Sequence, residues 1–387
     1  MKRPSQGFSL IELMTAITIG LMILMGLSSV FVNSSTASRE LKNTAEQIEN
    51  GRYAIELMSQ DIRHAGFYGE LSTLPAVPAS ADPCAAPTAG AVSASNNAAL
   101  ALAVQRVIGG TDCAALLTPD NLQADSDIVA VRRTDTTRLP VSCNLPVTVA
   151  VEANAVYLQT TPDAAEVQIP TSAVNINSTM NATGAVTATT LVRRDTTVAA
   201  GAAGTAGTCT ADTGQFPQMA ASIRKLRTHI YFVAPCSVPA DNNTAGFCTG
   251  ADDDNGRPIP TLKRLEMGAS GAFSIVPIVE GIEAIRVEYG LDTIPNTADI
   301  NTGLIGDGVT DSYTSTPSLA DAGNAISARI YVLARNTTPT TGYVDDKSYV
   351  LGGYTFTPAG AQTSYKRHVY NAEVRIVNPA GRREIPR

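Results

Sequence analysis

Residues 7–32 read GFSLIELMTAITIGLMILMGLSSVFV, and this stretch decides how the rest of the chain is arranged. It follows a short leader whose charges are the basic residues Lys2 and Arg3. The run from Leu13 to Val32 carries no charge. In a helix, about 20 such residues cover about 30 Å, the thickness of the hydrocarbon core of a bilayer. The sequence therefore predicts a membrane-spanning helix near the N-terminus.

Glu12 is the only charged residue between Phe8 and Ser38. A carboxylate in a membrane helix costs about 2.5–3.5 kcal/mol on insertion scales, so it marks a functional position with a partner. The same stretch contains no Lys, Arg or His that could be this partner. A cut after Gly7 would expose the α-amine of Phe8, a cation that the Glu12 of a neighbouring copy could bind. The pattern thus indicates cleavage followed by assembly.

A basic leader that ends in glycine, followed by Phe-Ser-Leu-Ile-Glu-Leu and a long apolar helix, resembles the class III signal of type IV prepilins. The resemblance implies that a membrane prepilin peptidase cuts after Gly7 and methylates the amine of Phe8. It also implies that Glu12 pairs with that amine in a neighbouring subunit. A secretory signal peptide would have a shorter apolar region and no acidic residue near its start. A plain single-pass anchor would explain the length of the segment, but neither the Gly-Phe junction nor the glutamate.

The helical pattern continues beyond the membrane segment. Apolar residues recur at spacings of three, four and seven, which places them on one face of a helix. Gly66 supplies a stop signal just beyond the last of them. We expect one helix from about Phe8 to Ala65, with a membrane-spanning and filament-core half at 8–32 and an amphipathic half at 33–66. The apolar face consists of Leu41, Ala45, Ile48, Ile55, Met58, Ile62 and Ala65.

Alternating apolar and polar residues predict strands after the helix. The clearest alternation runs from Ile326 to Ala334 and from Tyr370 to Ile376. Together these patterns predict an antiparallel sheet, and hence an α+β fold class. Further strand signals lie at 127–133, 155–160, 191–194, 223–233 and 282–291.

The chain is organised as the leader, residues 1–7, the two helix halves, and a β-rich head, residues 67–387. Residues 72–110 are rich in Ala, Pro, Ser and Asn, residues 182–214 are rich in Ala, Thr and Gly, and both read as long loop insertions. The head has room for one or two subdomains, divided as about 67–215 and 216–387. The resemblance to type IV pilins implies that the amphipathic helix half packs on the sheet of the head.

Within the prepilin class, both ends of the chain resemble the PilW group of minor pilins. This resemblance implies a non-enzymatic protein that helps to initiate type IV pilus assembly in a tip complex and supports twitching motility, adhesion or DNA uptake. The implied partners are other minor pilins, the major pilin, a large tip adhesin, the prepilin peptidase and the inner-membrane assembly platform. The segments that carry the resemblance are Glu49–Arg52, Gly66–Gly69, Asp127–Arg132, Val279–Glu283 and Val287–Asp292.

The basic leader also predicts the orientation of the chain. Positive charges stay on the cytoplasmic side of a membrane, so Lys2 and Arg3 place the N-terminus in the cytoplasm and the head in the periplasm. As a pilin, the subunit would then leave the inner membrane for the pilus fibre or its tip. With a formal net charge of −7, the chain is not expected to bind nucleic acid directly.

Two other functions remain open. A pseudopilin of a type II secretion system would share the leader, the helix and Glu12. A membrane-anchored hydrolase or binding protein would need its own site, and the sequence has no nucleophile elbow, phosphate-binding loop, zinc-protease motif or dinucleotide fingerprint. The three histidines, His64, His229 and His368, lie far apart and read as surface or sheet-face residues.

Six cysteines lie beyond the membrane segment, which favours disulfides in an oxidising periplasm over free thiols or a metal site. Cys236 and Cys248 flank a short Pro/Asn/Gly loop and form the one local pair that the sequence favours. The pairing of the other four stays open: Cys84, Cys113, Cys143 and Cys209.

Two acidic clusters are candidates for Ca²⁺, which takes several carboxylate and carbonyl oxygens from a loop. Residues 252–256 lack the first and last ligands of an EF-hand and read as a solvated turn. Asp292, Asp307 and Asp311 belong to an Asp/Gly-rich stretch, for which the alternative is a polar hairpin loop. No other cofactor is expected.

Overall fold

The computed structural model describes residues 9–72, 74–78, 81–85, 90–91, 98–139, 148–149, 151–160, 165–169, 176–177, 192–194, 218–220, 222–240, 247–268, 271–293 and 306–384. The predicted processing site at Gly7 and Phe8 lies outside these residues, as do Cys143 and Cys209.

The described elements follow one another along the chain as one long helix and a series of antiparallel strands. In order they are α1 (Leu10–Arg63), β1 (Gly90–Ala91), η1 (Ala98–Ala101), β2 (Val104–Val107), η2 (Pro119–Asn121), β3 (Ile128–Thr134), β4 (Thr148–Val149), β5 (Tyr157–Thr160), β6 (Ala165–Gln168), β7 (Ile176–Asn177), β8 (Val192–Arg194), β9 (Gln218–Ala220), β10 (Ser222–Ala234), α2 (Asp253–Gly256), β11 (Thr261–Met267), β12 (Phe273–Glu280), β13 (Ile282–Leu291), β14 (Ser312–Thr314), α3 (Leu319–Ala322), β15 (Ala325–Arg335), β16 (Tyr349–Leu351), β17 (Tyr354–Phe356), η4 (Gly360–Ser364), β18 (Arg367–Arg375) and α4 (Val377–Arg383).

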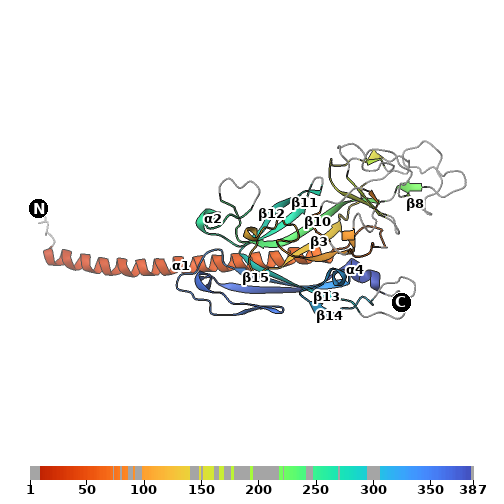
Figure 1. Ribbon diagram of the computed structural model, residues 1–387. Helices are drawn as coiled ribbons and strands as arrows, with labels where there is room; N and C mark the ends of the chain where they lie inside the picture. Colours follow the sequence, from red (N-terminus) through yellow and green to blue (C-terminus); the bar gives the residue numbers. More distant parts are fainter. Residues whose placement is uncertain are drawn as a thin grey trace.

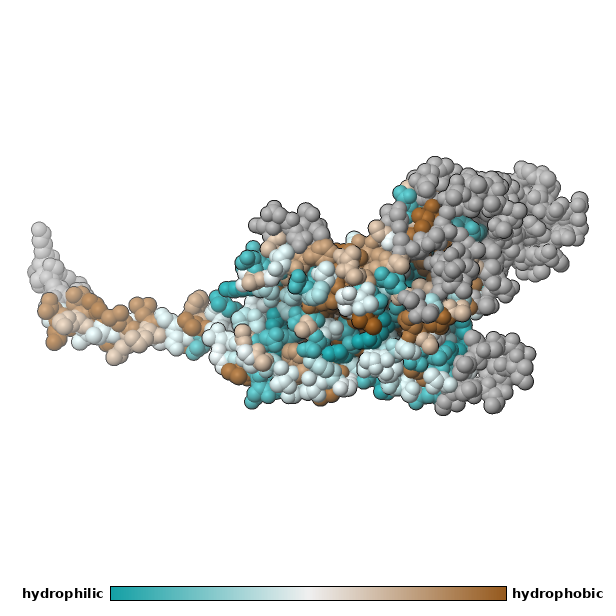
Figure 2. Space-filling model, viewed as in Figure 1, coloured by the Kyte–Doolittle hydropathy of each residue, from teal (hydrophilic) through white to brown (hydrophobic). Residues whose placement is uncertain are grey.

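Helix α1 is a single helix of 54 residues, which confirms the predicted long helix. Its N-terminal half projects away from the head (Figure 1) and presents apolar side chains around its surface (Figure 2). By length and composition it is the one helix of the described chain that could cross a membrane. The helix ends before Gly66, whose φ of +72° is a backbone conformation that favours glycine. This is the stop that the sequence predicts.

Two large antiparallel sheets form most of the described head, and three two-stranded sheets, β4-β7, β8-β9 and β16-β17, add to them. The larger has the strand order β1-β6-β5-β10-β11-β12, and β3 pairs with both β10 and β2. The smaller has the order β14-β13-β15-β18. The predicted strands at 223–233, 282–291 and 326–334 correspond to β10, β13 and β15, the long central strands of these sheets. The α+β fold is therefore confirmed.

The C-terminal half of α1 lies between the two sheets (Figure 1). Met58, Ile62 and Ala65 are fully buried and belong to one core with side chains from β3, β10, β13 and β15. The N-terminal part of the predicted apolar face is wrong as a core face, because Leu41 and Ile48 are 73% and 45% exposed. The head begins to bury the helix only at Gln47.

The sheets cross the predicted division of the head at about residue 215. Strand β10, on the C-terminal side of that division, pairs with β3 and β5 on its N-terminal side. The core that surrounds α1 also takes residues from both sides. In the described residues, the two halves of the head therefore share a sheet and a core.

Gly51 allows a close contact between α1 and the smaller sheet. A Cβ at this position would lie 2.1 Å from Cε2 of Tyr370 on β18. Glycine costs a helix about 1 kcal/mol relative to alanine, but overpacking costs about 1–3 kcal/mol. We expect Gly51→Ala to lower the free energy of unfolding of the full chain in detergent by about 1–2 kcal/mol, measured by chemical denaturation.

Gly26 is the matched control for this prediction, because nothing lies within 4 Å of the Cβ position there. Gly26→Ala should leave stability unchanged or raise it slightly. A gain in stability from Gly51→Ala similar to that from Gly26→Ala would show that Tyr370 does not require the glycine.

Candidate functional site

The segment that carries the predicted assembly site is the first turn of α1. Ser9 is the N-cap residue, and Glu12 lies in the first turn, where its backbone N–H donates to the carbonyl of Ser9 at 3.0 Å. Among the described residues, no cation lies within ion-pairing distance of Glu12. The apolar residues that follow, such as Leu13 and Ile17, are also exposed. This end of the chain thus offers an unpaired carboxylate and an apolar surface to neighbouring molecules.

Asp61 fastens the other end of α1 to the larger sheet. Its carboxylate is almost fully buried and accepts a hydrogen bond from Nε of Arg133 at 2.6 Å. It also accepts one from the hydroxyl of Tyr231 at 2.9 Å, and Nδ1 of His229 lies 2.6 Å away. Burial alone would raise the pKa of Asp61, but His229 and Arg133 hold it below its ordinary value. Asp61 is therefore a buried carboxylate held ionised by donors from β3 and β10.

Polar contacts from the middle of α1 hold the helix to the smaller sheet. Nε2 of Gln47 donates to the carbonyls of Ala334 and Lys366, at 2.9 and 3.0 Å. About two helical turns before Gln47, the carboxylate of Glu40 pairs with Nζ of Lys366 at 2.6 Å. These contacts fix the point at which α1 leaves the head.

A buried ionic cluster anchors the segment between β15 and β18. Arg367 is enclosed between Glu283 and Asp345: its Nε donates to Oε2 of Glu283 at 2.5 Å, and its Nη1 donates to Oδ2 of Asp345 at 3.0 Å. Arg335 approaches Glu283 at 3.5 Å. All four side chains are buried. We call Glu283, Arg335, Asp345 and Arg367 the ionic cluster.

The ionic cluster and the Asp61 contacts were not predicted from the sequence. His229 is a sheet-face residue of β10, as one of the two predicted readings has it, and it is buried against Asp61. His64 lies at the end of α1 with Nδ1 2.7 Å from the carbonyl of Gln60. His368 is exposed on β18, so the three histidines take three different environments and form no common site.

Two of the predicted calcium ligands, Asp292 and Asp311, join the residues at the end of β13 to residues 307–311. Asp292 is fully buried and accepts hydrogen bonds from the backbone N–H groups of Asp307 and Gly308, at 3.3 and 2.8 Å. Its Oδ2 also lies 3.8 Å from Nη1 of Arg383. Asp311 accepts from the N–H of Thr293 at 2.8 Å. These contacts describe a structural role, and calcium binding by Asp292, Asp307 and Asp311 stays a prediction.

The first acidic cluster is largely exposed, as predicted for a solvated turn, except at Asp253. Asp253 is buried and accepts hydrogen bonds from the N–H groups of Ala240, Thr249 and Gly250. These backbone donors lower the pKa of Asp253, although burial opposes them. The carboxylate organises this loop from inside, which is why the residue is not exposed to solvent.

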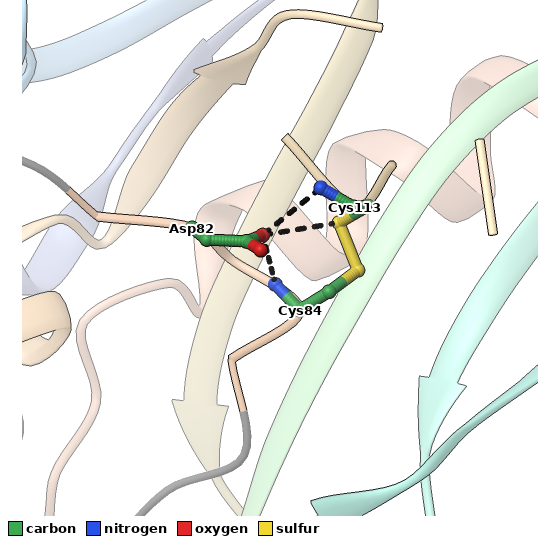
Figure 3. A group of neighbouring side chains, drawn as sticks. All are labelled: Asp82, Cys84 and Cys113. Atoms are coloured by element: carbon green, nitrogen blue, oxygen red, sulfur yellow. Dashed lines mark hydrogen bonds between the residues drawn. A yellow bond between two sulfur atoms is a disulfide. The ribbon is translucent and has the colours of Figure 1, made fainter. Parts of the chain in front are cut away.

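Two disulfides are present in the described residues. Cys236 is bonded to Cys248, the local pair that the sequence favours, and Cys84 is bonded to Cys113. Figure 3 shows Oδ1 of Asp82 facing the second bridge, where it accepts the backbone N–H groups of Cys84 and Cys113 at 2.9 and 3.0 Å. Both bridges have a nearby aspartate, Asp82 or Asp253. Because the sulfurs are bonded to each other, neither group offers a thiolate to a metal.

Comparison with known families finds two separate matches, one at the N-terminal helix and one in the head. Residues 2–28 match the prokaryotic N-terminal methylation motif, and residues 247–378 match the family described as type IV pilus-assembly protein W. The second match runs from before β11 to beyond β18 and includes the whole ionic cluster. Neither a curated protein nor a solved structure matches the chain. With the methylation motif at one end and the pilus-assembly segment towards the other, the chain matches a PilW-like type IV prepilin.

Proposed function

We propose that this chain is a minor pilin that helps to initiate the assembly of a type IV pilus and becomes part of its tip complex. The observation that carries the proposal is Glu12, which has no cation partner among the described residues and lies on an exposed apolar helix within the methylation motif. The match of residues 247–378 to a pilus-assembly family supports the same conclusion for the head. The proposed partners are the major pilin, other minor pilins, a tip adhesin and the inner-membrane assembly platform.

The proposed pathway starts in the inner membrane. The leader with Lys2 and Arg3 lies in the cytoplasm, and the head lies in the periplasm. A prepilin peptidase cuts after Gly7 and methylates the amine of Phe8. This amine then pairs with Glu12 of a neighbouring subunit as α1 enters the filament. The pairing removes an isolated charge from the apolar surroundings, where it is costly.

Replacing Glu12 with alanine is expected to leave cleavage intact and to reduce the amount of the chain in sheared pili. Removing one partner of a buried ion pair leaves the other charge unpaired, at a cost of roughly 3–5 kcal/mol. We therefore expect a decrease of about tenfold or more, measured by quantitative immunoblotting of pili against the membrane fraction.

Glu49→Ala is the matched control, because Glu49 is an exposed acidic residue on the same helix. It should enter pili at the normal level. Normal incorporation of the Glu12→Ala variant would contradict the proposed role of Glu12.

Deletion of the gene for this chain distinguishes a pilus from a type II secretion system. The proposal predicts the loss of surface pili, while exoprotein secretion continues. Loss of exoprotein secretion with normal pili would instead identify the chain as a pseudopilin.

A further inference from the structure

Strand β18 forms one edge of the smaller sheet and, among the described strands, pairs only with β15. All 9 of its residues are paired without a register shift. At one end of this ladder, the backbone N–H of Asn336 donates to the carbonyl of Lys366 at 3.0 Å. At the other end, the N–H of Ile376 donates to the carbonyl of Ile326 at 2.8 Å. In an antiparallel pair, residues bonded to the partner strand alternate with residues that face away. The even-numbered residues of β18 therefore face β15, and the odd-numbered residues face outward.

The outward-facing backbone groups of β18 form a free edge. The residues that carry them and are at least partly exposed are Val369, Asn371, Glu373 and Arg375. Among the described residues, no hydrogen bond reaches their N–H or C=O groups. From the first to the last of these residues the strand extends about 20 Å. Over this length, the edge of β18 offers a row of free donors and acceptors.

The edge strand β12 of the larger sheet is protected against such pairing, in contrast to β18. It contains Pro277, which has no N–H, and its ladder with β11 shifts register between Leu262 and Lys263. Strand β14, at the opposite edge of the smaller sheet, has only 3 residues. Proline, irregular register and short length are common means by which proteins keep an edge from binding another strand. Strand β18 has none of these features.

The charged side chains on the outer edge of β18 are paired within the chain. Glu373 pairs with Arg329 on β15, and Arg375 pairs with Glu384. Charged residues on an edge can also prevent pairing, but here each one is balanced by its neighbour. The edge therefore carries no net charge that would repel an added strand.

The two faces of β18 determine which side chains an added strand needs. Tyr370 and Ala372 belong to the face that packs on the core around α1, and both are only partly buried. On the opposite face, Asn371 and Glu373 are exposed. A neighbouring strand continues both faces of a sheet. A strand next to β18 would therefore cover the first face with apolar side chains and present polar ones on the second.

We propose that β18 binds an extended segment of another pilus subunit, with alternating apolar and polar residues, as an added strand of the smaller sheet. An extended polypeptide presents donors and acceptors at the spacing of the free edge. That the partner is a pilus subunit rests on the proposed function, under which α1 enters the filament. Tyr370 of β18 lies against Gly51 of α1, so the free edge is next to the helix that brings subunits together.

A second copy of this chain does not fit the free edge. Antiparallel pairing of two β18 strands would make the two α1 helices run in opposite directions, although the proposed function anchors both in one membrane. Parallel pairing along the same edge would invert one of the two sheets. The polar residues Asn371 and Glu373 of one copy would then continue the face of Tyr370 and Ala372 in the other. The partner is therefore a subunit of different sequence.

Asn371→Pro tests the added strand, because the outward N–H of Asn371 donates to no group among the described residues. Proline removes this N–H, while the hydrogen bonds between β18 and β15 stay. We expect the Tm of the full-length variant in detergent to remain within about 2 °C of the wild type. An added strand would lose a hydrogen bond and meet the proline ring. The amount of the chain in sheared pili should therefore fall about tenfold, measured by quantitative immunoblotting against the membrane fraction.

Asn371→Ala is the matched control, because it shortens the same side chain but keeps the N–H. It should have the Tm of the wild type and enter pili at the wild-type level. Equal amounts of the wild type and Asn371→Pro in pili would overturn the added strand and leave the proposed function intact. Absence of the wild-type chain from pili would overturn both proposals.

Photo-crosslinking provides a second measurement that does not depend on how the proline variant folds. Benzoylphenylalanine in place of Asn371, in cells that make pili, should crosslink to one pilus subunit of different sequence. Mass spectrometry should locate the crosslink in a segment of alternating apolar and polar residues. The same group in place of Ile108, an exposed residue directly after β2, should not reach this segment. No crosslink from position 371, a crosslink to a second copy of this chain, or the same crosslink from both positions would overturn the proposal.

Discussion

Replacing Arg367 with glutamine is expected to lower the free energy of unfolding by about 3–5 kcal/mol. Arg367 is the only described cation in contact with both Glu283 and Asp345. Without it, Asp345 would lose its ion pair, and Glu283 would keep only the longer contact with Arg335 at 3.5 Å. A buried ion pair contributes little net stability when it is complete, but breaking one leaves a buried charge uncompensated. The measurement is chemical denaturation of the full chain in detergent.

Arg329→Gln is the control for this prediction. Arg329 lies on β15 and pairs with Glu373 on β18 at 2.9 Å, but both side chains are substantially exposed. Exposed pairs of this kind contribute about 0–1 kcal/mol because water screens the charges. If Arg367→Gln destabilised the chain no more than Arg329→Gln, the ionic cluster would not hold the segment between β15 and β18 in place.

Asp61→Asn is expected to lower the free energy of unfolding by about 2–4 kcal/mol at neutral pH, because hydrogen bonds to charged groups contribute about 1.5–3 kcal/mol each. The variant keeps the shape of the side chain but removes the charge that faces Arg133 and His229. An amide also donates where the carboxylate only accepts, so it meets donors from β3 and β10. The effect is large because this residue joins α1 to the larger sheet.

The pH dependence of stability provides a second measurement of the same contact. The pKa of Asp61 is lower in the folded chain than in the unfolded chain. Its contribution is therefore complete above the unfolded value of about 4, and it is lost as the pH falls from there through the folded value. In Asp61→Asn, the stability should decrease less steeply below about pH 4 than in the wild type.

Glu49→Gln serves as the control, because this carboxylate on α1 is exposed. Its acid profile should follow that of the wild type. Identical acid profiles for Asp61→Asn and the wild type would mean that Asp61 does not link α1 to the larger sheet through its charge.

Much of the fold follows from local sequence patterns. An apolar run without charges predicts the exposed half of α1, and strict alternation predicts β15 because successive side chains on a strand point to opposite faces. The predicted helix Phe8–Ala65 and the observed Leu10–Arg63 differ by two residues at each end. Periodicity alone predicted a longer buried face on α1 than the structure has, because an apolar pattern does not show which of its residues the head covers. Leu41 precedes Gln47, the first residue of α1 that the head buries, and Ile48 lies directly after it but is still 45% exposed.

The polar anchors depend on contacts between residues that are distant in the chain. Glu283 and Arg367 meet only because β13 and β18 both flank β15, and local sequence does not determine that strand order. Asp61 did carry a local signal. It lies three residues after Met58 and four before Ala65, so a charged residue stands on the buried face of the helix. Such a position indicates a buried partner, although the sequence does not identify His229 and Arg133.

Mass spectrometry of the N-terminus of the mature chain, purified from its host with the pilus fraction, tests the central claim most directly. The account predicts a polypeptide that begins at Phe8 and carries a methyl group on its α-amine, while a Gly7→Ala variant keeps most of its leader. A mature chain that still begins with residues 1–7 and is recovered without any filament would contradict the account, because Glu12 would then lack the cation that its position requires.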